Sequence, residues 1–90
     1  MIDGISAMAA QQLTLQDGQV LETNFDQYQL LRMFQAPEVE VHFIQSDNEP
    51  SGLGEPALPP VAGAIVNAIY AINGERIREI PLSQSGYRIV

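Results

Sequence analysis

The chain has 90 residues and no cysteine, 46% of its residues are hydrophobic, and its formal net charge is −7. The missing cysteine excludes disulfides, thiolate metal sites and thiol catalysis within the chain, and eleven acids against four bases argue against nucleic acid as a partner. No apolar run is long enough to span a membrane. A chain this short buries only about 60% of the surface that its unfolded form exposes, so we expect a small core.

The first part of the chain predicts a short helix followed by a hairpin. Residues 5–12 are good helix formers, and Asp3 is a candidate N-cap. Asp17-Gly18 separates two short alternating runs at 13–16 and 19–23. This dipeptide favours a type I′ turn, because that turn needs positive φ at both central residues. We therefore expect these two runs to pair as antiparallel strands.

The middle of the chain carries a weaker helical signal and one further strand signal. Residues 30–34 could make a single helical turn, although Pro37 and the glutamine-rich surroundings favour an irregular connection. Residues 39–45 alternate apolar and polar side chains, which predicts a half-buried strand. His42, the sole histidine, lies on this strand beside Glu40, and we interpret it as a surface or interface residue rather than a metal ligand.

A helix from Pro59 to Asn73 has the clearest boundaries in the sequence. Turn-forming residues precede it, Pro59 and Pro60 suit a first helical turn, and Gly74 suits the left-handed position after the last turn. Nearly every side of this helix is apolar, which is typical of a buried helix.

Together these elements predict an α+β fold. We expect a small, mainly antiparallel sheet, made of the hairpin and one further strand, packed against the buried C-terminal helix and the short N-terminal helix. A length of 90 residues fits one small domain or a piece of a larger one, and residues 83–90 are expected to form a tail. Apolar helix faces and unpaired strand edges predict that the isolated chain forms homo-oligomers.

Glu55 is the candidate functional residue, because it stands between Gly54 and Pro56 at the mouth of the apolar helix. One interpretation is a solvated acid in a surface turn. In the other, Gly52 and Gly54 let a ligand approach the backbone, the helix N-terminus favours a nearby anion, and the carboxylate acts as a general base. The pattern by itself leaves both interpretations open, and it predicts no metal ligands.

An ordered series of motifs then points to a family. It comprises Gly52-Leu53-Gly54-Glu55, the helix and turn "AIVNAIYAINGERI" at 64–77, Ile80-Pro81-Leu82 and, upstream, "NFDQYQLLRM" at 24–33. Over residues 4–82 the chain resembles the C-terminal end of the molybdopterin-binding large (beta) subunit in the xanthine dehydrogenase and aldehyde oxidoreductase family. Isoquinoline 1-oxidoreductase beta subunits are the subgroup that it resembles most.

The resemblance implies a role for Glu55 as the active-site base of a molybdenum hydroxylase, beside a molybdenum–pterin cofactor for which Gly52 and Gly54 leave room. Water would supply the oxygen added to an aldehyde or N-heterocycle. Electrons would leave through iron–sulfur clusters of a partner subunit or domain.

Such a subunit is several hundred residues longer, and loops outside this chain hold most of the pterin. The resemblance therefore implies that residues 1–90 are a single partial domain, the C-terminal piece of a molybdenum-cofactor-binding domain. It also implies that the chain needs the rest of the large subunit, and that alone it binds no cofactor and catalyses nothing. The alternative is a non-catalytic module that keeps the fold and associates with itself or with another chain. The N-terminus lacks the basic region of a signal peptide, and the compartment, cytoplasm or periplasm, is left open.

Overall fold

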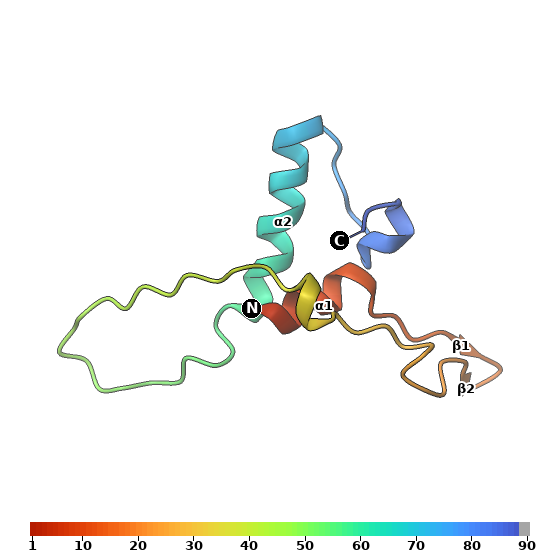
Figure 1. Ribbon diagram of the computed structural model, residues 1–90, viewed down its shortest axis with the longest axis horizontal. Coiled ribbons are helices and arrows are strands. Elements are labelled where there is room, and N and C mark those ends of the chain that lie inside the picture. The colour runs from red at the N-terminus through yellow and green to blue at the C-terminus, as the bar shows by residue number, and fades with distance from the viewer. Residues whose placement is uncertain (89–90) are drawn as a thin grey trace.

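The computed structural model describes residues 1–88, in which two α-helices, two short strands and two 3₁₀-helices follow one another. In chain order they are α1 (Ile2–Ala10), β1 (Leu15–Gln16), β2 (Gln19–Val20), η1 (Met33–Gln35), α2 (Leu58–Asn73) and η2 (Leu82–Ser85). The hairpin and a long loop project to opposite sides of the helices (Figure 1). Two helices and a two-stranded antiparallel sheet confirm the predicted α+β class.

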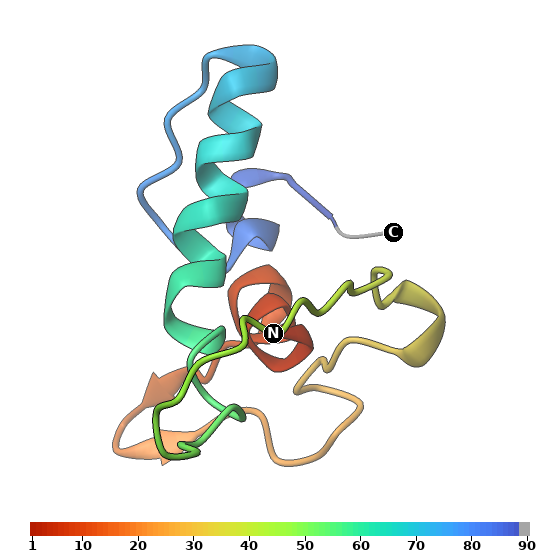
Figure 2. The same cartoon turned by 90° about the vertical axis from the view of Figure 1, so that its left-hand side faces the viewer.

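The small core lies where α1, α2 and η2 meet. Its buried side chains, Met8, Ile77 and Leu82, are surrounded by half-buried ones. The latter are Ala62, Ile65, Val66, Ile69 and Tyr87. Both views show α1 and η2 along the same side of α2 (Figure 1 and Figure 2).

Gly4 allows the close approach of α1 to α2. A Cβ added at Gly4 would lie 2.5 Å from Val61 Cγ1 and 3.0 Å from the Leu58 carbonyl oxygen. The helix itself begins three residues earlier and ends two residues earlier than predicted, and Asp3 lies in its first turn rather than at the N-cap, which is Met1. Packing on α2, rather than capping, thus fixes this helix.

The ends of α2 confirm the prediction, whereas its burial does not. Gly74 adopts φ of 74° and donates its N–H to the Tyr70 carbonyl oxygen at 2.8 Å. No residue of α2 is buried, and Ile72 is 85% exposed. The prediction of a buried helix was wrong for this chain, because α1 and η2 cover only one side and no other described element reaches the rest.

The hairpin has the predicted turn but shorter strands. Asp17 and Gly18 have φ of 50° and 78°, and Leu15 pairs with Val20. Beyond Val20 one more backbone hydrogen bond joins the two segments, from the Leu21 N–H to the Thr14 carbonyl oxygen at 3.0 Å, and the Thr14 N–H donates instead to the Glu22 carboxylate at 2.7 Å. Both strands are exposed, and within residues 1–88 neither packs against a helix, so the sheet does not cover α2 as predicted.

The further strand predicted at 39–45 does not form. Residues 36–57 make one long loop without regular structure, and Val41 and Phe43 in it are 64% and 68% exposed. A strand needs a hydrogen-bonded neighbour, and the hairpin that could have served lies on the other side of the molecule (Figure 1).

The expected tail at 83–90 lies partly outside the described residues. Its described part folds back on the body: Gln84 Nε2 donates to Gln12 Oε1 at 2.7 Å, and the Tyr87 hydroxyl donates to the Glu75 carboxylate. Asn73 Nδ2 in turn donates to the Tyr87 hydroxyl at 2.7 Å. These hydrogen bonds tie η2 to the segment after α1, and Tyr87, just after η2, to the end of α2.

The molecule is less compact, and exposes more surface, than a typical globular protein of its mass. Its accessible surface is 7548 Å², whereas a compact 9.9 kDa monomer exposes about 5,200 Å². The radius of gyration is 16.1 Å, against about 12 Å for a compact domain of this length. No helix within the described residues is both long enough and apolar enough to cross a membrane.

Candidate functional site

Glu55 lies in the last turn of the long loop, directly before α2. Its carbonyl oxygen accepts the Leu58 N–H at 2.8 Å, which fixes the backbone of the turn onto the helix. The side chain is exposed and lines an open hollow together with Gly52, Gly54, Pro56 and Pro59. Among residues 1–88 no hydrogen-bond or ion-pair partner faces the carboxylate. The group is therefore available to a proton donor from outside the chain.

The start of α2 differs from the anion-binding helix terminus that the sequence suggested. The Leu58 N–H is taken by Glu55, and Pro59 and Pro60 have no N–H. The first turn thus offers few donors to an anion, although the helix dipole remains. The shortage of N–H donors could have been predicted from the two prolines in the sequence.

Gly52 and Gly54 stand in open space. A Cβ added to either would meet nothing within 4 Å, and neither has a left-handed φ. Nothing in this chain therefore requires glycine at these two positions. Side chains here would narrow the hollow beside Glu55, so the glycines keep that side of the loop open to a large group.

The other acids and the histidine do not gather around Glu55. Asp47 and Glu49 are exposed in the same loop, and Asp17 is the hairpin turn residue. His42 is exposed and lies 3.4 Å from Glu40, as expected for a surface residue. Within the described residues no three histidine or acidic side chains could hold a metal ion together.

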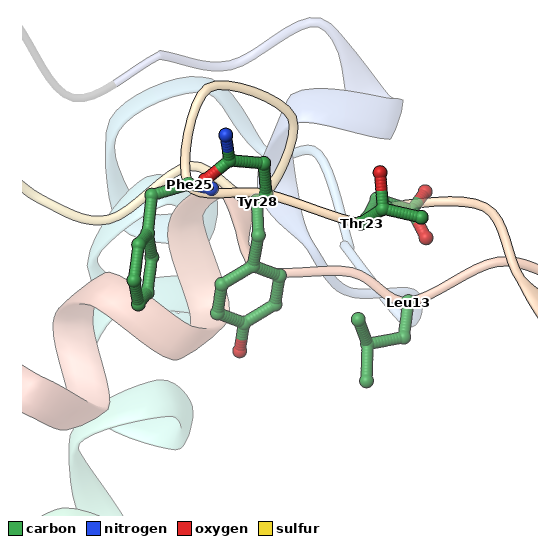
Figure 3. A pocket seen from close by; sticks show the side chains of 6 residues that line it. Leu13, Thr23, Phe25 and Tyr28 are labelled. Carbon is green, nitrogen blue, oxygen red and sulfur yellow. Dashed lines mark hydrogen bonds between the residues drawn. The ribbon is translucent and has the colours of Figure 1, made fainter.

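A second hollow lies beside the hairpin, remote from Glu55 in the sequence. Leu13, Phe25 and Tyr28 line its apolar side, and Glu22, Thr23 and Asn24 complete it (Figure 3). The hydrogen bond from Thr14 lowers the pKa of Glu22. This carboxylate is therefore already engaged in a hydrogen bond with the backbone beside the hairpin.

A polar network holds the segment after the hairpin against α1, and sequence reasoning missed it. Buried Ser6 accepts hydrogen bonds from Gln11 Nε2 at 2.7 Å and from the Leu31 N–H at 2.9 Å. The Tyr28 hydroxyl donates to Gln11 Oε1 at 3.0 Å. No local pattern signals these contacts, because Ser6 and Leu31 are 25 positions apart.

Comparison with known proteins shows three similar oxidoreductases. A membrane-bound aldehyde dehydrogenase of Gluconacetobacter polyoxogenes, named for pyrroloquinoline quinone, is 34% identical over 79 residues, or 88% of this chain. The beta subunit of the isoquinoline 1-oxidoreductase of Brevundimonas diminuta is 30% identical over 91% of the chain. One subunit of the nicotinate dehydrogenase of Pseudomonas putida is 30% identical over 98% of it. No protein-family model and no solved structure matches the chain.

These relatives indicate a family of molybdenum-dependent oxidoreductases. Over 88–98% of its length the chain is similar to these members of the xanthine dehydrogenase family, which confirms the resemblance that its motifs indicated. Two of the relatives are named as subunits, which indicates multi-subunit enzymes. The chain spans about a tenth of the length of the curated relatives it matches, at 10%, 10% and 8%.

Proposed function

We propose that this chain is part of the large subunit of a molybdenum hydroxylase and that Glu55 is the general base of that enzyme. The observation that carries the proposal is the similarity to three oxidoreductases over 88–98% of the chain. The exposed, unpartnered carboxylate at the edge of a glycine-bordered hollow supports the assignment of Glu55.

The residues around the hollow leave room for a molybdenum–pterin group, but they offer too few hydrogen-bond donors to bind it. Gly52 and Gly54 leave space for a large group beside the loop. The single charge lining the hollow is the negative Glu55, and the first turn of α2 has few free donors, so an anionic pterin must be held by other parts of the large subunit. When bound, the group supplies the two-electron acceptor for oxidation of an aldehyde or N-heterocycle.

The part of this chain in the reaction is a proton transfer. The Glu55 carboxylate accepts the proton that water loses as its oxygen is transferred to an electron-poor carbon of the substrate. The backbone bond from Leu58 to the Glu55 carbonyl oxygen holds the turn, so α2 positions the acid. Iron–sulfur clusters of a partner subunit or domain would take up the electrons.

Replacement of Glu55 in the full-length enzyme tests this role. Glu55→Gln keeps the shape but cannot accept the proton, so we expect kcat to fall by about 10²–10⁴-fold with molybdenum and pterin content unchanged. Glu49→Gln is the matched control, since Glu49 is an exposed acid of the same loop, and it should leave kcat unchanged. If the Glu55→Gln enzyme, loaded with cofactor, had the kcat of the parent enzyme, the proposed role would be wrong and Glu55 would be a surface acid in a turn.

The second candidate role is a non-catalytic module that associates with a second copy of itself. It is favoured by the accessible surface of 7548 Å², large for a chain of 9.9 kDa, and by exposed apolar side chains on α2 and in the long loop. Sedimentation equilibrium at micromolar concentration tests it, with a dimer or larger species as the expected result.

A further inference from the structure

The part of the long loop at residues 39–43, called here the 39–43 segment, has the sequence pattern of a β-strand but, within residues 1–88, no strand beside it with which to pair. Glu40 Oε2 lies 3.4 Å from His42 Nε2, so these side chains, two positions apart, share one face of the backbone. Val39, Val41 and Phe43 alternate with them. This period of two is that of a β-strand. The segment runs as an open, extended trace on the outside of the molecule (Figure 1).

Among residues 1–88 its backbone groups are unpaired and two of its three apolar side chains are exposed, whereas Val39 is half-buried. Within the described part of the chain, the N–H and C=O groups of the 39–43 segment make no hydrogen bond to the protein. Val41 and Phe43 are 64% and 68% exposed. A hollow lined by Ile2, Leu53 and residues of the segment continues this apolar surface. An exposed strand of this kind pairs with another strand when one is available.

We propose that the 39–43 segment pairs antiparallel with the same segment of a second copy of this chain, with Val41 opposite Val41. This inference rests on the second candidate role, self-association, and names its contact. The pairing is isologous, since two copies meet through one patch related by a two-fold axis.

Charge and apolarity together select this register. With Val41 opposite Val41, Glu40 faces His42 of the other copy on one side, and Val39 faces Phe43 on the other. The Glu40 carboxylate can accept a hydrogen bond from the imidazole, so each two-fold pair is complementary.

Neighbouring registers lose this complementarity. A shift of two residues in one direction brings Glu40 opposite Glu40, and in the other direction it brings His42 opposite His42. A shift of one residue opposes apolar and polar side chains on both faces of the pair. The sequence of the segment is therefore self-complementary in one register.

Cysteine cross-linking tests the register, because the chain has no cysteine of its own. In the proposed pair the two Cα atoms at position 41 lie about 5 Å apart, within reach of a disulfide. Under mild oxidation at micromolar concentration, Val41→Cys should form a disulfide-linked dimer. Phe43→Cys is the matched control, since its two copies would lie about 13 Å apart, too far for a disulfide, and it should link at least about tenfold more slowly.

A mixture of Val39→Cys and Phe43→Cys chains should form the mixed dimer, because these positions face each other. Equal cross-linking of Val41→Cys and Phe43→Cys would overturn the register. A native chain that sediments as a dimer while Val41→Cys fails to link would overturn this contact and leave self-association standing. A native chain that sediments only as a 9.9 kDa monomer would overturn both.

Discussion

Glu55 shows how one backbone hydrogen bond can hold a residue in place while its side chain stays exposed. Its carbonyl oxygen accepts a hydrogen bond from the Leu58 N–H at the start of α2, while its carboxylate stays exposed in an open hollow. Pro59 and Pro60 remove further donors from the same helix turn, so the carboxylate is not drawn onto the helix terminus. The acid is thus held by its backbone and left unpaired at its side chain, which is the arrangement that a base needs before substrate arrives.

Glu22 is an acid whose side chain is occupied instead. The Thr14 N–H donates to it at 2.7 Å, and this bond lowers the pKa of Glu22 below its ordinary value of 4.5. A carboxyl with a lowered folded pKa contributes stability above the unfolded pKa, and that stability is lost as the pH falls through the folded value.

We therefore predict that acid loosens the hairpin at Thr14. The NMR shift of the Thr14 amide should titrate below pH 4.5, the ordinary carboxyl value, as the Glu22 carboxylate takes up a proton. In the Glu22→Gln variant, whose side chain does not titrate, the same amide should show no such transition. An unchanged transition in that variant would assign it to another group.

At the scale of elements, α1 and α2 touch through a glycine. In most helix interiors, replacement of glycine by alanine stabilises by about 0.5–1 kcal/mol, because alanine has less backbone entropy to lose. At Gly4 a methyl group would instead collide with Val61 and with the Leu58 backbone of α2.

We predict that Gly4→Ala lowers the free energy of unfolding by about 1–3 kcal/mol, the usual cost of an overpacked contact. Gly63→Ala is the matched control, because Gly63 lies inside α2 and an added Cβ there meets nothing within 4 Å. That variant should be more stable than the parent. Urea unfolding followed by circular dichroism measures both, and a stabilised Gly4→Ala protein would show that the helices can move apart freely.

The elements that sequence analysis predicted correctly are those fixed by neighbouring residues. Asp17-Gly18 determines the hairpin turn, and Gly74 determines the end of α2, because each needs only a local backbone conformation. The strand at 39–45 and the burial of α2 depend on segments distant in sequence or outside this chain. Their hydrophobic patterns predicted pairing and burial, but no segment among residues 1–88 provides the necessary neighbours.

The candidate site likewise has features that local sequence predicted and contacts that it did not. The position of Glu55 at the helix mouth and the openness around Gly52 and Gly54 followed from local sequence. The contact of Ser6 with Leu31 could not be predicted, since it depends on how the chain returns to α1. The catalytic role of Glu55 stays a prediction.

At the scale of the whole molecule, the structure is too open to be a compact enzyme by itself. The long loop that carries Glu55 is covered by nothing within the described residues, and residues 40–56 are all exposed. Loops of this length without regular structure are uncommon inside compact domains, and they are usually functional or packed by other segments.

We predict that the isolated chain binds no molybdenum–pterin cofactor with useful affinity. A large anionic group needs many converging donors, whereas this chain has a net charge of −7 and its hollow beside Glu55 is bordered by two glycines and one acid. Expression of the 90-residue chain in a cofactor-producing host, followed by metal and pterin analysis, measures this. Stoichiometric cofactor in the purified chain would contradict the prediction.

The most direct test of the central claim is the mass and molybdenum content of the native polypeptide that contains these residues, isolated with an antibody to the chain. Because the relatives are about ten times longer than the matched stretch, the account predicts a polypeptide of several hundred residues with close to one molybdenum per chain. A native polypeptide of 9.9 kDa, or a long one that carries no molybdenum, would contradict it.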